Sequence, residues 1–109
     1  MAEEEEGMVP AVKLLVTYEV KENTGVDYHK FIMGQYLPTL QSLGLQMSEA
    51  WYTAYGDAPN RMMGFVSPDK GAMNDMLISD TWYELTETLS GFVDELDYKV
   101  IPYKQGFQI

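Results

Sequence analysis

The spacing of apolar residues changes repeatedly along the chain, and this succession constrains the fold more than any single motif. Apolar and polar residues alternate from about Val12 to Val20, and the alternation returns at 45–55, 61–67 and 97–104. Between these segments, apolar residues recur every three or four positions, as they do on one side of a helix. The sequence therefore predicts the order β-α-β-β-α-β.

The alternation also assigns side chains to strand faces. The first strand has a core face, made of Val12, Leu14, Val16, Tyr18 and Val20, and a mixed face, made of Lys13, Leu15, Thr17 and Glu19. Strict alternation in the second strand places one set together, namely Leu45, Met47, Glu49, Trp51, Thr53 and Tyr55. The residues of "GDAPN" (56–60) favour a turn, so the second and third strands form a predicted hairpin.

The two helical segments have apolar faces of their own. In the first segment, one side of the helical wheel holds His29, Ile32, Met33, Tyr36, Leu40 and Leu43. Pro38 lacks an amide hydrogen and predicts a kink there. The second segment, 67–96, is expected in two pieces, and the apolar face of its second piece comprises Ile78, Trp82, Leu85, Leu89, Phe92, Val93 and Leu96. Trp82 lies in the middle of that face and is expected in the core.

This order of elements is the ferredoxin-like pattern of the α+β class. It predicts one four-stranded antiparallel sheet with both helices on one face. The chain has 109 residues, enough for one domain, which we place at 9–109. Residues 1–8, "MAEEEEGM", form an acidic tail that we expect to be disordered.

Two helices leave the other face of such a sheet uncovered, and a Trp51 and Tyr55 patch there would be unusual on a monomer. A second copy of the chain, packed sheet to sheet, would bury both faces in a dimeric α+β barrel. The chain remains apolar to its last residues, so Phe107 and Ile109 are expected at the dimer interface. The alternative is that "GFQI" (106–109) packs under its own chain.

Composition excludes several functions. A net charge of −10 repels phosphate backbones and anionic lipids, so neither nucleic acid nor membrane is an expected partner. Without cysteine there is no disulfide or thiolate chemistry, and one histidine with no ligands at a diagnostic spacing predicts no metal site. The sequence lacks secretory-signal features and a membrane-length apolar run, so we expect a cytoplasmic protein.

His29 is the histidine on the predicted inward helix face, near the helix N-terminus. Burial and the helix dipole would both favour its neutral form, which can act as a general base or bind a ligand. The plainer alternative is a core histidine with its hydrogen bonds satisfied. Arg61, the one arginine, suits a ligand carboxylate, although pairing with Asp57 across the turn is the plainer interpretation.

A small-molecule pocket is predicted in the cleft between sheet and helices. Its candidate lining combines aromatic walls with a few polar groups, Thr17, Tyr36, Glu49, Trp51 and Tyr55. The alternatives are interface packing for Trp51 and ordinary core packing for Tyr36. The sequence contains no phosphate-binding loop or dinucleotide fingerprint, so no cofactor is predicted.

Three segments resemble small NIPSNAP-like members of the dimeric α+β barrel superfamily: "FIMGQYLPTLQSLG", "MLISDTWYELTETLSGFVDEL" and "YKVIPYKQGFQI". The resemblance implies the fold and a homodimer from Val12 onward. The superfamily also includes cofactor-free antibiotic-biosynthesis monooxygenases and muconolactone isomerases, which implies oxygenation or isomerisation of a small apolar substrate. The superfamily also has a haem-binding branch, but the three matched segments are not the motifs of that branch. The alternative is a non-catalytic binding or structural dimer.

Overall fold

The computed structural model describes residues 10–55 and 58–103, except for the side chains of 53–60. Its elements are β1 (Val12–Val20), α1 (Gly25–Phe31), η2 (Ile32–Tyr36), α2 (Leu37–Ser42), β2 (Gln46–Tyr55), β3 (Ala58–Ser67), α3 (Lys70–Leu77), α4 (Asp80–Ser90) and β4 (Val93–Pro102). The predicted order β-α-β-β-α-β is confirmed, with each helical region divided into shorter helices.

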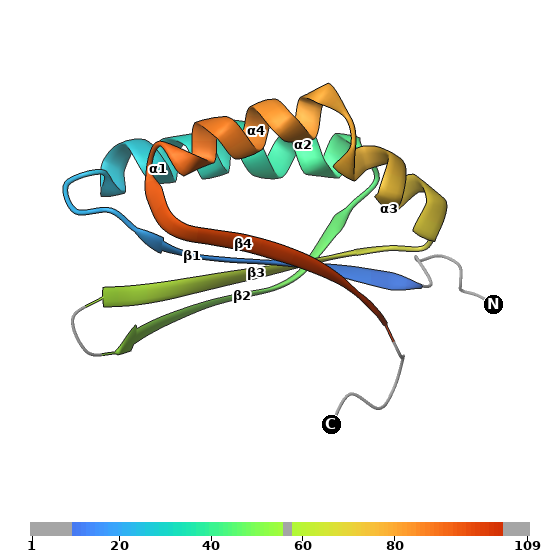
Figure 1. Cartoon of the computed structure of the whole chain (residues 1–109), viewed down its shortest axis with the longest axis horizontal. Coiled ribbons are helices and arrows are strands. Elements are labelled where there is room, and N and C mark those ends of the chain that lie inside the picture. The colour runs from blue at the N-terminus through green and yellow to red at the C-terminus, as the bar shows by residue number, and fades with distance from the viewer. Residues whose placement is uncertain (1–9, 56–57, 104–109) are drawn as a thin grey trace.

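The four strands form one antiparallel sheet in the order β2-β3-β1-β4, and the helices lie together on one side of it (Figure 1). The predicted α+β class is therefore confirmed. We call the side under the helices the inner face and the opposite side the outer face. On β1 the inner face is the predicted core face, and four of its side chains are buried, Val12, Leu14, Val16 and Tyr18.

The core between the layers is rich in aromatic rings. Tyr36 is fully buried, and its ring lies 5.8 Å from Phe31, 6.4 Å from Phe65 and 6.3 Å from Trp82, between centroids. Trp82 is buried as predicted and meets Tyr98 of β4 edge to face, at 5.2 Å. These contacts fasten α4 to both η2 and the sheet.

The first helical region contains one turn of π-helix, η2. This turn ends two residues before Pro38, the position at which the sequence predicted a kink. Besides Phe31, the buried residues of the region are spaced by four, Tyr28, Ile32, Tyr36 and Leu40, whereas an α-helix turns every 3.6 residues. The wider turn, closed by the Leu37 amide donating to the Ile32 carbonyl, keeps these residues on one face. The predicted inward positions of His29, Met33 and Leu43 are therefore wrong, and all three side chains are exposed.

A β-bulge in β2 divides the face that strict alternation had assembled. Met47 pairs with Phe65 on the inner face, but Glu49 pairs with Gly64 and Trp51 with Met62 on the outer face. The extra residue is Ser48, which reverses the alternation after Met47. A Cβ atom at Gly64 would lie 3.1 Å from atoms of Ser48 and Glu49, so glycine leaves room for the bulge.

The helical face predicted to run on through Phe92, Val93 and Leu96 is wrong, because α4 ends at Ser90. Val93 instead pairs with Val20 and begins β4, four residues before the predicted strand start at 97. A second bulge follows, at which Glu95 has a φ of 58°, a conformation that residues other than glycine rarely adopt.

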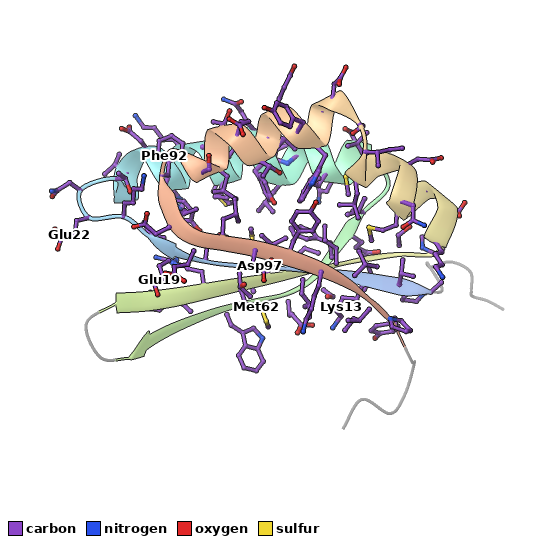
Figure 2. The ribbon with its side chains drawn as sticks, viewed as in Figure 1. Lys13, Glu19, Glu22, Met62, Phe92 and Asp97 are labelled. Carbon is purple, nitrogen blue, oxygen red and sulfur yellow. The ribbon has the colours of Figure 1, made fainter. Side chains whose placement is uncertain are left out.

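The outer face has a mixed composition. Lys13 and Glu49 form a half-buried ion pair at 2.7 Å, and Lys13 and Met62 project from the sheet away from the helices (Figure 2). Strand register places further side chains on this face, Leu15, Trp51, Val66, Lys99 and Ile101. No helix in the described ranges covers it (Figure 1).

Candidate functional site

A groove of about 370 Å³ opens between the first helical region and strands β2 and β3. Its apolar lining comes from helix and sheet alike, Ile32, Met33, Leu37, Met47, Ala50 and Met63. Its aromatic and polar lining comprises Tyr18, Tyr28, His29, Trp51, Tyr52 and Arg61, with Met62 beside them. We call this space the helix–sheet groove. An apolar cleft with a few polar groups at one end is the usual form of a small-molecule site.

The polar end of the groove is built on one row across the sheet. Arg61 of β3 pairs in register with Tyr18 of β1 and with Tyr52 of β2, so all three lie side by side on the inner face. Tyr28 of α1 completes the group. The Arg61 guanidinium carbon lies 4.4 Å from the Tyr52 ring centroid and 5.4 Å from that of Tyr28. These distances are within the range of cation–π attraction, which holds the cation between sheet and helix.

The hydroxyls of Tyr18 and Tyr28 share a hydrogen bond of 2.6 Å. Burial, followed by the bond to Tyr28, raises the pKa of Tyr18 well above its ordinary value of 10. Burial also raises the pKa of Tyr36, whose hydroxyl is buried with no hydrogen-bond partner. Tyr18 and Tyr36 therefore stay protonated at neutral pH, so neither supplies a phenolate that could act as a base. In the Tyr18–Tyr28 hydrogen bond either hydroxyl can be the donor.

A second hollow, of about 520 Å³, includes outer-face residues and is acidic. Its lining holds three carboxylates, those of Glu19, Glu95 and Asp97, beside Thr17 and Trp51. In the ranges 10–55 and 58–103, no group of three or more metal-binding side chains is close enough to hold an ion. This hollow shares Tyr18, Arg61, Trp51 and Met62 with the helix–sheet groove, so the two spaces adjoin.

The structure brings together some of the predicted site residues. His29 and Trp51 both line the helix–sheet groove, although His29 is exposed where a buried position was predicted. Trp51 also borders the second hollow, together with Thr17. The side chain of Trp51 is 60% exposed and stands at the rim of both spaces.

Other predicted site residues lie elsewhere. Tyr36 is in the core and lines neither space. Glu49 is on the outer face, bound to Lys13. The side chain of Tyr55 lies outside the described residues, as do Asp57, Phe107 and Ile109.

Sequence reasoning missed Tyr18, Tyr28 and Tyr52 as site residues. Tyr18 and Tyr52 become neighbours of Arg61 only through strand register, which no local pattern reveals. Tyr28 precedes His29 by one position, and the four-residue spacing from Tyr28 to Ile32 and Tyr36 was the available signal for the buried face.

The hydroxyl pair supports a stability prediction. We expect Tyr18→Phe to lower the free energy of unfolding by about 1–3 kcal/mol, because the buried Tyr28 hydroxyl loses its partner. The double variant Tyr18→Phe/Tyr28→Phe should lose less free energy of unfolding than the sum of the two single variants. In the double variant no buried hydroxyl is left without a hydrogen-bond partner. Urea unfolding of the four proteins measures the coupling. Additive losses would show that the 2.6 Å bond does not couple the two residues.

None of the helices in the described part of the chain is long and apolar enough to cross a bilayer. No family model and no curated protein matches the chain. Solved structures do match it. A conserved protein from Methanosarcina mazei has 16% identity and a TM-score of 0.63, with 87% of this chain and 94% of that chain covered.

Two further structures bear the names of the groups that the sequence resembles. An uncharacterized NIPSNAP domain protein from Burkholderia xenovorans has 9% identity and a TM-score of 0.64, over 90% of this chain and 99% of that one. A candidate antibiotic biosynthesis monooxygenase from Deinococcus radiodurans has 10% identity and a TM-score of 0.65, over 90% and 97%. At such identities the likeness shows a shared fold, and at that level the resemblance is confirmed.

Proposed function

We propose that the chain binds a small, largely apolar molecule in the helix–sheet groove. The observation that carries this proposal is the lining, in which methionine and aliphatic side chains form the walls and Arg61 with three tyrosines forms one end. The volume, about 370 Å³, is at the lower end of the range for small-ligand sites, roughly 300–1,000 Å³. The flexible methionines Met33, Met47 and Met63 suit an apolar guest whose shape need not be fixed.

Exposed apolar surface at the mouth of the groove supports the same function. Trp51 and Tyr52 are 60% and 58% exposed, and Met33 across the groove is also exposed. Large apolar side chains gathered at one opening are a common mark of a binding site. A bound apolar molecule would cover part of this surface.

We also propose that the functional unit is a homodimer, with the outer faces of two sheets packed together. Leu15, Met62 and Ile101 offer this face apolar area, and no helix of the described chain lies over it. The Lys13–Glu49 pair neutralises two charges that would otherwise oppose burial. The predicted interface positions of Phe107 and Ile109 belong to this proposal.

Catalysis is the finer part of the proposal. The name of the neighbour from Deinococcus radiodurans, a candidate antibiotic biosynthesis monooxygenase, favours oxygenation over the isomerisation that the sequence resemblance also implied. In a cofactor-free oxygenation the substrate would supply the electrons and O₂ would be the oxidant. His29 is the candidate general base on the groove, and its side chain is exposed. The alternative is a binding module without turnover.

Blocking the groove tests the binding function. We expect the chain to bind a neutral, environment-sensitive dye such as Nile red, and we expect Ala50→Trp to weaken that binding at least tenfold. Ala50 lines the groove from an exposed position, so a tryptophan there fills the space without replacing core. Glu87→Trp, on the exposed side of α4, adds the same ring elsewhere and should leave dye binding unchanged.

Native mass spectrometry of the purified protein is the companion measurement. A dimer with extra mass that disappears on denaturation would support both the dimer and the groove and would supply a ligand to identify. Equal dye binding by the chain and by Ala50→Trp would contradict the groove as the binding site.

A further inference from the structure

The surroundings of Arg61 imply a more specific ligand than an apolar molecule. Its guanidinium carbon lies over the rings of Tyr52 and Tyr28, at 4.4 and 5.4 Å from their centroids. Cation–π attraction engages the charge of a guanidinium and does not use its N–H donors. The donors of Arg61 can therefore still bind an acceptor.

One of those donors has no acceptor. The Nε atom of Arg61 is buried and has no hydrogen-bond partner, and Arg61 forms no salt bridge with another residue of the described ranges. A buried donor without a partner loses its hydration and receives nothing in exchange, which is costly for a charged group. An anionic acceptor that reaches this donor would remove that cost.

The hydroxyl pair adds a second donor at the same end of the groove. When one of Tyr18 and Tyr28 donates to the other, the accepting hydroxyl keeps its own hydrogen. Both tyrosines line the groove with Arg61, so a cation and a phenol converge on one region. Together they match an acceptor with two oxygens.

We infer that the helix–sheet groove selects apolar molecules that carry a single carboxylate, with the carboxylate at Arg61 and the apolar body between the helix and β2. This inference rests on the binding function proposed above and adds the chemical class of the ligand.

The surrounding charge disfavours a dianion such as phosphate more than it disfavours a monoanion. Glu19, Glu95 and Asp97 line the adjoining hollow, which also includes Arg61. Their field would repel a dianion more strongly than a carboxylate. Arg61 itself would repel a cation, and a bidentate carboxylate fits the edge of one guanidinium. Met33, Leu37 and Met47 would then contact the hydrocarbon body.

Calorimetric titration of the full chain with decanoate, methyl decanoate and decanol tests the inference without any variant. The three probes share an apolar chain and differ in the head group. We expect decanoate to bind roughly 10- to 100-fold more tightly than either neutral probe, the range for a hydrogen bond to a charged group. Equal binding of all three would overturn the carboxylate selectivity and leave the apolar groove intact.

Variants of Arg61 then locate the selectivity. Arg61→Met keeps an apolar stem and should remove most of the preference for decanoate over decanol. Arg61→Lys keeps the positive charge but lacks the planar, two-pronged set of donors. It should therefore retain part of the preference for decanoate. Lys30→Met removes a positive charge from an exposed position on α1 and should leave the binding of all three probes unchanged.

The failures of the two proposals are distinguishable. If none of the probes binds and Ala50→Trp behaves like the unaltered chain toward Nile red, the binding function itself is wrong. If decanoate is preferred but Arg61→Met retains the full preference, the carboxylate is held elsewhere and the inference is wrong.

Discussion

Replacing Trp82 with alanine is expected to lower the free energy of unfolding by about 3–5 kcal/mol, the usual range for truncating a buried tryptophan. The side chain is 4% exposed and lies in the first turn of α4. Its ring contacts Tyr36 of η2 and Tyr98 of β4, so the cavity would loosen the packing of α4 against both η2 and the sheet. Rigid neighbouring rings relax poorly into such a cavity. Urea or thermal unfolding followed by circular dichroism measures the loss.

Tyr83 provides the matched control, because it is the next residue on the same helix and is 64% exposed. Tyr83→Ala should change the free energy of unfolding by no more than about 0.5 kcal/mol, as is usual for surface positions. A small domain has about 5–15 kcal/mol of stability, so the Trp82 variant should be visibly destabilised at room temperature. Equal effects of the two substitutions would contradict the assignment of Trp82 to the core.

Replacing Leu15 with aspartate is expected to weaken the proposed dimer by 100-fold or more in its dissociation constant. Leu15 is half-buried in the outer face of β1, between Lys13 and Thr17. In a symmetric sheet-to-sheet interface the substitution would bury two new carboxylates, each costing several kcal/mol if unpaired. Sedimentation velocity over a series of concentrations measures the dissociation constant.

Tyr83→Asp on the helical side serves as the control for added charge, since Tyr83 faces solvent on the opposite layer. Circular dichroism should show that both aspartate variants remain folded. A chain that is monomeric without any substitution would contradict the dimer itself. A dimer that tolerates Leu15→Asp would place the interface on another surface.

The order of elements and the inner face of β1 could be predicted because they depend on local periodicity. Val12, Leu14, Val16 and Tyr18 alternate, and alternation in a strand places them on one face whatever the rest of the chain does. Trp82, Leu85 and Leu89 recur at helical spacing and are buried as expected. Each pattern is complete within one element, so the sequence alone was sufficient.

Departures from regular geometry could not be predicted in this way. One additional residue at Ser48 moved Glu49 and Trp51 to the face opposite Met47. One π-turn placed Tyr28, and not His29, on the buried face of the first helical region. A bulge or π-turn that shifts the pattern by one residue changes the local free energy little. Whether it forms is decided by packing against another element. Periodicity therefore identified the right helix and strand but selected the wrong side chains for the site.

By itself, then, the sequence determined which segments become strands and helices, because hydrophobic burial imposes the period of each element on its own residues. Only the tertiary structure decided what surrounds Arg61. Tyr18 and Tyr28 lie far from it in the chain, and Tyr52 lies across the hairpin; all three reach it through the pairing of three strands and the packing of α1 above them. Strand register is a long-range choice, settled by the packing of all the elements together. The candidate site therefore exists only in the folded chain.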